Sequence, residues 1–222
     1  MEDEKGYIIV TPGTLLATSP KTGNGTYISE NKTYSKYLGI LKKSESHINV
    51  LPFKYSYRPM VGDRIIGRIK DFNYPFFIVN MTSPAPSFLY LSDVSSRFME
   101  QEELMQQYKP GTWIYAEIAE ISDRIKLSMK MNEAKKLEGG RMASVSPSKV
   151  PRIIGKNASM IKMIQEKTKT HILVGQNGVV WIKGDNAGIV VKVIEKISRE
   201  AHISGLTDRI SKYLEGELKN GK

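Results

Sequence analysis

Short runs of hydrophobic residues with a period of two dominate the first 133 residues of the chain. The segment 64–72 alternates between apolar and polar positions, and β-branched or aromatic residues fill 7–10 before the turn signal Thr11-Pro12-Gly13. Such runs between turn residues predict β-strands. By the same criteria we expect strands at 26–28, 33–41, 47–52, 76–81, 88–91, 113–118 and 125–129.

Five of these strands lie in 57–133, and their number and spacing suit a small barrel such as the OB-fold. The strands before them predict a small all-β domain at 1–56. Strand alternation also places Phe76 and Phe77 on opposite faces of their strand, so one of the two rings is expected to be buried.

From residue 145 onward the pattern changes to mixed α and β. Apolar positions recur at helical spacing in 160–167 and again in 185–201, which places isoleucine and valine on one face of a long helix. Two strands, 171–174 and 179–182, are predicted between these helices.

Turn residues complete the outline of the last third. Asn177-Gly178 is a strong hairpin signal between the two predicted strands. Residues 134–144 contain Gly139-Gly140 and few large apolar residues, which is typical of a linker. We therefore predict a third domain at 134–222, ending in a helical tail, and a multidomain protein of mainly β plus α+β class.

The formal net charge of +10 is concentrated at the C-terminal end of the chain. Residues 57–133 hold nine Lys and Arg against ten acidic residues, whereas 134–222 hold 17 against eight. A basic domain attracts polyanions by releasing their counterions, so nucleic acid is the first candidate partner. A solvated lysine surface is the alternative explanation of the same charge.

Several classes of protein and site are disfavoured by composition. The chain has no cysteine, which excludes disulfides, thiolate metal sites and cysteine nucleophiles. It lacks a run of about 18 apolar residues that would span a membrane, and Met1–Lys5 lacks the apolar core of a secretory signal. These absences favour a cytoplasmic protein without a membrane partner.

The sharpest motif is the segment Val150-Pro151-Arg152-Ile153-Ile154-Gly155-Lys156-Asn157-Ala158-Ser159-Met160-Ile161. It resembles the KH signature, in which an Ile-Ile-Gly-x-x-Gly turn joins two helices, and the resemblance covers about 145–205. Ala158 stands where the family has its second glycine, so a methyl group is expected in the turn.

The KH resemblance implies a clamp on about four nucleotides of single-stranded RNA. A glycine turn lets the RNA backbone approach the main chain, and the following helix N-terminus favours phosphate. Ile153, Ile154, Ile161 and Ile172 are expected in or beneath the base-reading groove. The candidate RNA-binding residues of this module are Arg152, Ile154, Gly155, Lys156, Asn157, Ala158 and Lys162.

Residues 57–131 resemble the OB-fold RNA-binding repeat named after ribosomal protein S-one. The resemblance is carried by Val61-Gly62-Asp63-Arg64, the aromatic strand 72–79, Leu91-Ser92-Asp93 and Pro110-Gly111. Such domains stack bases on exposed aromatic rings and hold the backbone with nearby cations. The candidate RNA-binding residues of this module are Arg68, Lys70, Phe72, Tyr74, Phe76 and Arg124.

No motif in the sequence indicates catalysis, a metal or a cofactor. His47, His171 and His202 are far apart and lack an accompanying acidic pair, phosphate loop or metal-ligand spacing. We therefore expect no catalytic residue, no metal ligand and no cofactor.

The order of the three domains resembles the RNA-binding cap subunits of the archaeal exosome, of the S-one/KH type. The Pro12-Gly13 segment is similar to that family's opening motif, and the resemblance covers nearly the whole chain. It implies a non-catalytic cap that captures single-stranded RNA for a 3′-to-5′ RNA-degrading complex. Three caps would sit on a hexameric ring of RNase PH-like subunits, with 1–56 as the ring-docking domain.

Two other functions remain as alternatives. A transcription elongation or antitermination factor also places an S-one repeat before KH, but has two KH modules and a helical N-terminus. A small RNA hydrolase would use similar RNA-binding modules and would degrade RNA without partners.

Overall fold

The computed structural model describes residues 8–21, 23–44, 46–52, 57–83, 85–96, 99–201, 203 and 205–220. The chain divides into two compact units, Met1–Tyr55 and Ser56–Lys222. Tyr7, the first residue of the first expected strand, lies outside the described residues. Within these ranges, no helix is long and apolar enough to cross a membrane.

The N-terminal unit contains two small antiparallel sheets, with strand orders β1-β5-β6 and β2-β4-β3. Val10, Leu16, Ile48 and Val50 form its buried core. The all-β prediction for this region is therefore confirmed among the described residues. Its strands are β1 (Ile9–Val10), β2 (Leu15–Ala17), β3 (Thr26–Ser29), β4 (Lys32–Ser35), β5 (Gly39–Lys43) and β6 (Ile48–Pro52).

The single strand expected at 33–41 is wrong, because the chain turns in the middle of it. β4 ends at Ser35 and β5 begins at Gly39, and the two strands belong to different sheets. The buried hydroxyl of Ser35 donates a hydrogen bond to the carbonyl oxygen of Tyr37, 2.7 Å away, which stabilises the turn between them.

The barrel predicted for the middle of the chain is confirmed. Its strands follow the order β11-β9-β8-β7-β10-β12, and the pairing of β10 with β11 closes the sheet. Phe77 is buried inside the barrel and Phe76 points outward, as the alternation of the strand predicts. The strands are β7 (Arg64–Asn73), β8 (Phe76–Asn80), β9 (Ser87–Tyr90), β10 (Trp113–Ile121), β11 (Ile125–Ser128) and β12 (Lys135–Leu137).

Two short helices occupy the connection between β9 and β10. The 3-10 helix η1 (Leu91–Asp93) directly follows β9, and α1 (Gln101–Gln107) was not predicted from the sequence. The sequence of α1 is almost entirely polar, and Leu104 is its buried residue. A helix with one buried position lacks the apolar periodicity on which the prediction depended.

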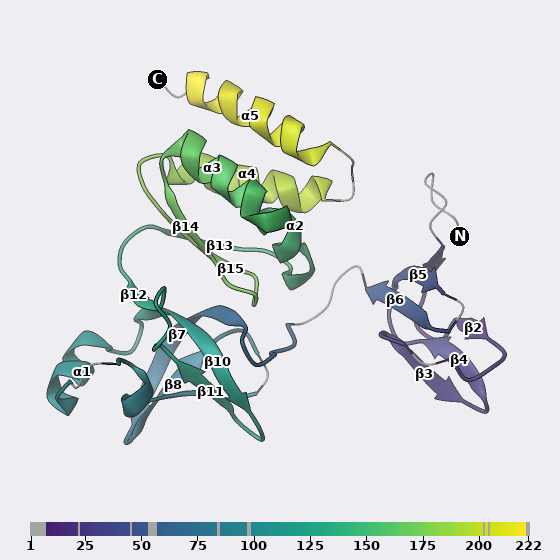
Figure 1. The fold of residues 1–222 in the computed structure, drawn as a ribbon, viewed down its shortest axis with the longest axis horizontal. Coiled ribbons are helices and arrows are strands. Elements are labelled where there is room, and N and C mark those ends of the chain that lie inside the picture. The colour runs from purple at the N-terminus through teal and green to yellow at the C-terminus, as the bar shows by residue number, and fades with distance from the viewer. Residues whose placement is uncertain are drawn as a thin grey trace. The chain divides into compact units, whose positions relative to one another are not determined.

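The KH fold is confirmed at the C-terminal end of the chain. Its antiparallel sheet has the order β13-β15-β14, and helices cover one face of it (Figure 1). The elements are β13 (Arg141–Ser144), η2 (Pro147–Lys149), α2 (Val150–Ile154), η3 (Lys156–Ala158), α3 (Ser159–Thr168), β14 (His171–Val174), β15 (Val179–Lys183), α4 (Ala187–Glu200) and α5 (Leu206–Asn220).

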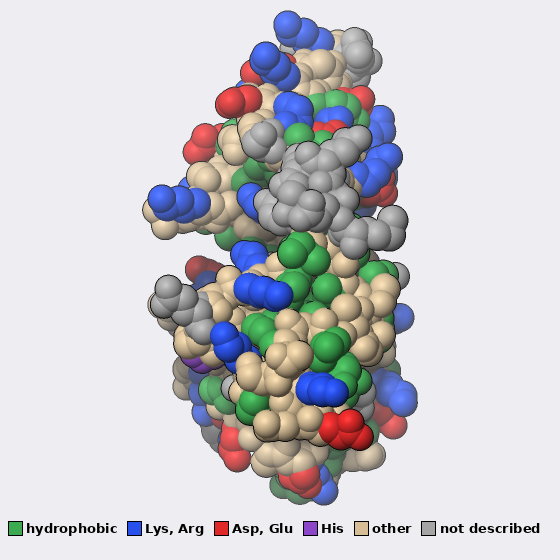
Figure 2. Space-filling model, turned by 90° about the vertical axis from the view of Figure 1, so that its right-hand side faces the viewer, with side chains coloured by type: hydrophobic (Ala, Val, Ile, Leu, Met, Phe, Trp, Pro, Cys, Tyr) green, Lys and Arg blue, Asp and Glu red, His purple; other side chains and the backbone are tan. Residues whose placement is uncertain are grey.

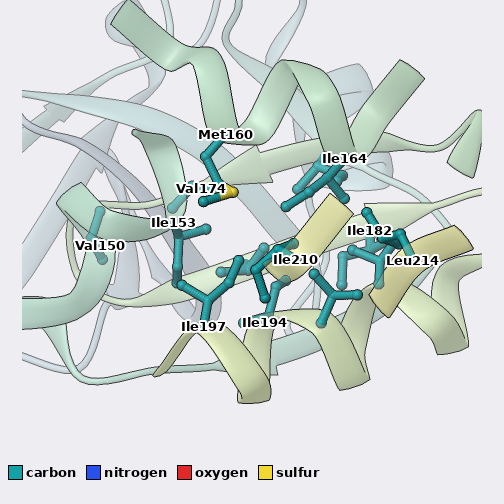
Figure 3. Packing of buried hydrophobic residues seen from close by; sticks show 14 of the residues in the cluster. Val150, Ile153, Met160, Ile164, Val174, Ile182, Ile194, Ile197, Ile210 and Leu214 are labelled. Carbon is teal, nitrogen blue, oxygen red and sulfur yellow. The ribbon is translucent and has the colours of Figure 1, made fainter. Parts of the chain in front are cut away.

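The two faces of the KH sheet bury different clusters. Val180 and Ile182 of β15 join the core beneath the helices, in one cluster with Ile153, Ile164 and Ile197 (Figure 3). Val179 and Trp181 alternate with them and lie in a second cluster that includes Ile66 and Tyr115 of the barrel. The barrel and the KH sheet therefore share an apolar interface.

The C-terminal helix α5 is an integral part of the KH core. Leu206 is buried in the same cluster as the KH helices. Ile210 and Leu214 are buried in it as well (Figure 3). The helix was expected only as a tail, because the resemblance to the KH family ended near residue 205.

The linker predicted at 134–144 is wrong. β12 pairs with β10 of the barrel, and β13 pairs with β15 of the KH sheet, so both halves of the segment are strands. Three residues, Glu138, Gly139 and Gly140, separate these strands. The strands were not predicted because charged residues on a partly exposed edge interrupt the apolar pattern; these residues are Lys135, Lys136 and Arg141.

Candidate nucleic-acid interface

The turn between α2 and α3 has the geometry of a main-chain binding loop. Gly155 ends α2 with φ 77° and ψ 172°. A Cβ atom at this position would lie 2.7 Å from the backbone nitrogen of Met160, so glycine is required. Its amide donates to the carbonyl oxygen of Pro151 at 2.9 Å, which fixes the start of the turn.

The rest of the turn is left-handed. Asn157 has φ 51° and Ala158 has φ 61°, which is the region that favours glycine. Ala158 therefore adopts the positive φ angle that its family's glycine would adopt, and its methyl group is partly exposed. No side chain caps the first turn of α3, which leaves this helix end open to an anion.

Three cations surround the turn. Arg152, Lys156 and Lys162 are exposed, and none of them forms an ion pair within the described part of the chain. Arg152 and Lys156 also line a cavity of about 400 Å³, whose opposite wall is the start of α5. The turn thus presents main chain and positive charge together, which suits a phosphate backbone.

The apolar residues expected near the groove are divided between surface and core. Ile153 and Ile172 are buried in the KH core, whereas Ile154 and Ile161 are partly buried and pack against it. Ile154 adjoins Gly155 at the end of α2 and is therefore the candidate nearest to the turn.

A cluster of aromatic rings covers the outside of the barrel. The ring of Phe76 meets those of Phe88 and Tyr90 edge-on, with centroid distances of 4.8 Å and 5.4 Å. β8 and β9 pair in a register that places Phe76 opposite Tyr90. All three rings are partly exposed, which leaves part of their area free for stacking with bases. We call Phe76, Phe88 and Tyr90 the aromatic cluster.

Two cations flank the aromatic cluster, one in the neighbouring strand β11 and one just before it. The guanidinium of Arg124 lies 5.5 Å from the centre of the Phe88 ring, and the ammonium of Lys126 lies 5.6 Å from that of Tyr90. Lys126 also pairs with Asp93 at 3.2 Å. Both cations and the rings of Phe88 and Tyr90 line a cavity of about 330 Å³. Rings and cations side by side are the combination that holds single-stranded RNA.

The remaining barrel candidates lie outside this cluster. Phe72 packs against the buried ring of Phe77, 4.9 Å between centroids, whereas Tyr74 is 70% exposed. Arg68 donates to the carbonyl oxygen of Gly111 at 3.2 Å, and with Lys70 it lines a separate depression. The structure thus brings Phe76 and Arg124 together and leaves the other four barrel candidates apart from them.

Sequence reasoning missed Phe88, Tyr90 and Lys126. The alternation of Phe88, Leu89 and Tyr90 carried the signal, because burial of Leu89 turns the two rings outward. Among the described residues, no group of histidine and acidic side chains is arranged to hold a metal ion.

Comparison with known proteins gives matches along most of the chain. A family model described as "Exosome RNA binding protein RRP4 N-terminal domain" matches residues 8–54, and a KH domain model matches 140–188. A crystal structure of a "putative exosome complex RNA-binding protein" is 30% identical with a TM-score of 0.66, covering 76% of this chain and all of that one.

Similar full-length relatives come from several archaea, and each is described as exosome complex component Rrp4. The protein of Methanothermus fervidus is 39% identical, over 93% of this chain and 94% of its own. That of Thermoplasma volcanium is 38% identical, with 96% and 92% covered, and that of Pyrococcus abyssi is 36% identical, with 96% and 84% covered.

Proposed function

Because this chain belongs to the Rrp4 family of exosome components, we propose that it is the RNA-binding cap of an exosome that degrades RNA in the 3′-to-5′ direction. The cap captures single-stranded RNA and guides it toward the catalytic ring. The observation that carries this proposal is the aromatic cluster between Arg124 and Lys126. Rings flanked by cations bind bases and phosphates without a sequence requirement.

The KH turn is proposed as the second contact on the same RNA. Arg152 and Lys156 would hold phosphates at the open end of α3, and Lys162 would add charge along the helix. Several weak sites on one strand produce avidity, so neither site needs to bind tightly alone.

The cap is proposed to bind RNA without cutting it, as a member of an assembly whose ring does the chemistry. The candidate sites consist of aromatic rings, cations and main chain, which are groups that hold RNA. A transcription elongation or antitermination factor is not favoured, because the relatives similar over nearly the whole chain are exosome components.

Residues 1–56 are proposed to dock on a hexameric ring of RNase PH-like subunits in the cytoplasm, with three caps on each ring. Leu15 and Leu38 are about half exposed in this unit, and Ile8, Tyr27 and Ile28 are exposed as well. On the face seen in Figure 2, hydrophobic side chains lie exposed beside lysine or arginine side chains. Exposed apolar residues of this kind mark interaction surfaces.

The test combines RNA binding, nuclease activity and assembly. The purified chain is expected to retain an unstructured single-stranded RNA on a filter and to leave it intact. The variant Leu15→Glu/Leu38→Glu is expected to bind RNA normally but to lose co-elution with the ring subunits. Degradation of RNA by the chain alone would contradict the non-catalytic role, and unchanged co-elution would contradict docking through this unit.

A further inference from the structure

The turn between β14 and β15 of the KH module extends the backbone ladder of the barrel. β8 pairs with β7 only as far as Asn80 opposite Arg68, so the backbone of Ile66 has no strand partner on that side. The side chain of Asn177 takes this place. Its amide nitrogen donates to the carbonyl oxygen of Ile66 at 2.8 Å, and its amide oxygen accepts the N–H of Ile66 at 3.3 Å.

Asparagine suits this position because its side-chain amide is the same chemical group as a peptide unit. The second N–H of the amide donates to the carbonyl oxygen of Met81 at 3.0 Å, just beyond the end of β8. Asn177 is only 3% exposed, so these bonds lie away from water. A side chain that removed them would leave buried backbone groups of the barrel unpaired.

The main chain of the turn reinforces the contact. The amide of Gln176 donates to the carbonyl oxygen of Arg64 at 2.8 Å. A Cβ atom at Gly175 would lie 2.8 Å from the backbone nitrogen of Ile66, so the turn approaches β7 as closely as the chain permits. Beside it, Trp181 and Val179 pack with Ile66 and Tyr115 in one apolar cluster.

This contact joins the two candidate RNA sites through a short rigid path. Arg68 follows Ile66 by two residues and points outward, and Asn80 opposite it belongs to the strand that carries Phe76. On the KH side, β14 follows α3 directly, and α3 begins at the turn that connects it to α2. Strands and helices connect Asn177 to both sites without a long loop.

We propose that Asn177 is a positioning residue, which fixes the aromatic cluster and the KH turn in one orientation so that a single RNA strand meets both. This inference rests on the proposed function of RNA binding. An RNA long enough to reach both sites then binds without the loss of orientational freedom that two loosely tethered modules would suffer. An RNA too short to reach both sites gains nothing from the arrangement.

The experiment compares two RNAs by fluorescence anisotropy with the full chain. One RNA has about four nucleotides, enough for a KH groove, and the other about 20, enough for an OB-fold and a KH groove together. The variant Asn177→Ala is expected to bind the short RNA like the wild type and to lose roughly tenfold or more in affinity for the long one. Asn132→Ala, at an exposed asparagine of the same unit, is the matched control and is expected to change neither affinity.

Each outcome decides a separate question. Failure of the wild-type chain to bind either RNA would refute the proposed function itself. Equal losses for both RNAs in a folded variant, or no loss for either, would refute the positioning role and leave the proposed function intact. Circular dichroism checks folding. Gly175→Ala places a Cβ against both the amide oxygen of Asn177 and the backbone of Ile66, so it is expected to reproduce the selective loss, and it decides the matter if Asn177→Ala unfolds.

Discussion

The ring of Phe76 meets the ring of Phe88 at 4.8 Å between centroids, with an interplanar angle of 82°. The two residues lie on paired strands, and this edge-to-face contact holds each ring upright on the barrel surface. An incoming base therefore meets rings that are already oriented, with Arg124 beside Phe88 to contact the adjoining phosphate.

Replacing Phe88 with alanine is expected to weaken binding of single-stranded RNA by about 10- to 100-fold, the equivalent of about 1–3 kcal/mol for one stacked base. The salt dependence is expected to stay the same, because no charge is removed. Filter binding at several salt concentrations measures both quantities. The control is Tyr27→Ala, which removes an exposed ring from the N-terminal unit; equal effects of the two variants would argue against a stacking site on the barrel.

Charge removal at the turn between α2 and α3 is expected to change the salt dependence of RNA binding as well as its strength. The double variant Arg152→Gln/Lys156→Gln should weaken binding and lower the slope of log affinity against log salt by about 1.4, or about 0.7 for each lost phosphate contact to a single strand. Lys42→Gln/Lys43→Gln, the matched control, removes the same charge from exposed positions of the N-terminal unit. A slope that stays at the wild-type value in Arg152→Gln/Lys156→Gln would show that the RNA phosphates do not contact these two residues.

The left-handed conformation of Ala158 predicts a gain in stability on substitution by glycine. At φ 61° an alanine costs roughly 1–2 kcal/mol more than a glycine, and part of that is offset by the greater chain entropy of glycine in the unfolded state. Ala158→Gly is therefore expected to raise the free energy of unfolding by about 0.5–1 kcal/mol in urea titrations.

Gly155→Ala is the informative counterpart to that change. Its Cβ would approach the backbone of Met160 at a positive φ, so a loss of stability is expected. Stabilisation by both substitutions, or by neither, would contradict the geometry described for the turn.

The stability of the unit that contains His171 is expected to fall as the pH drops below about 6.5. Partial burial and the nearby charges of Lys135 and Lys183 hold the pKa of His171 below its ordinary value of 6.5. Below that pH the unfolded chain binds a proton at this residue more readily than the folded chain does, so the free energy of unfolding decreases. Above it both states are neutral at this residue and no dependence arises.

One contact adds to this pH effect beside the partial burial of the ring. Lys135 donates a hydrogen bond to Nε2 of His171 at 2.7 Å, which requires a neutral ring. His171→Gln is expected to flatten the decline in melting temperature between pH 7.5 and 5.5, whereas His47→Gln, in the N-terminal unit, is expected to preserve it. A decline of the same steepness in His171→Gln would place its origin at other groups.

The residues that sequence analysis placed correctly are those whose pattern repeats. Apolar and polar residues alternate along the barrel strands. The KH motif forms a helix–turn–helix, and its turn requires glycine. Segments without a repeating pattern of their own were not predicted: β12 and β13 are short and charged, and Leu104 is the buried residue of α1. Their conformations are imposed by the strands or core against which they pack.

The candidate sites could likewise be predicted only where a local pattern in the sequence contains them. Gly155 and its neighbours could be identified because one segment contains the whole turn. The aromatic cluster is assembled from β8 and β9, and the cations beside it come from β11 and the residue just before it, so recognising it required the register between strands. Asn177 was identified as a hairpin residue. Its contact with Ile66 joins positions 111 residues apart, so no local sequence pattern could predict it.

The short connection between β12 and β13 limits how the barrel and the KH module can be recombined during evolution. Its three residues join an edge strand of the barrel to an edge strand of the KH sheet, and the indole N–H of Trp181 donates to the carbonyl oxygen of Gly139 at 2.8 Å, tying the connection down. A chain break within 135–144 would strip an edge strand from one sheet or the other. Gene rearrangements that preserve folding should therefore move the barrel and the KH module as one block, and neither is expected to be exchanged for a homologue without the other.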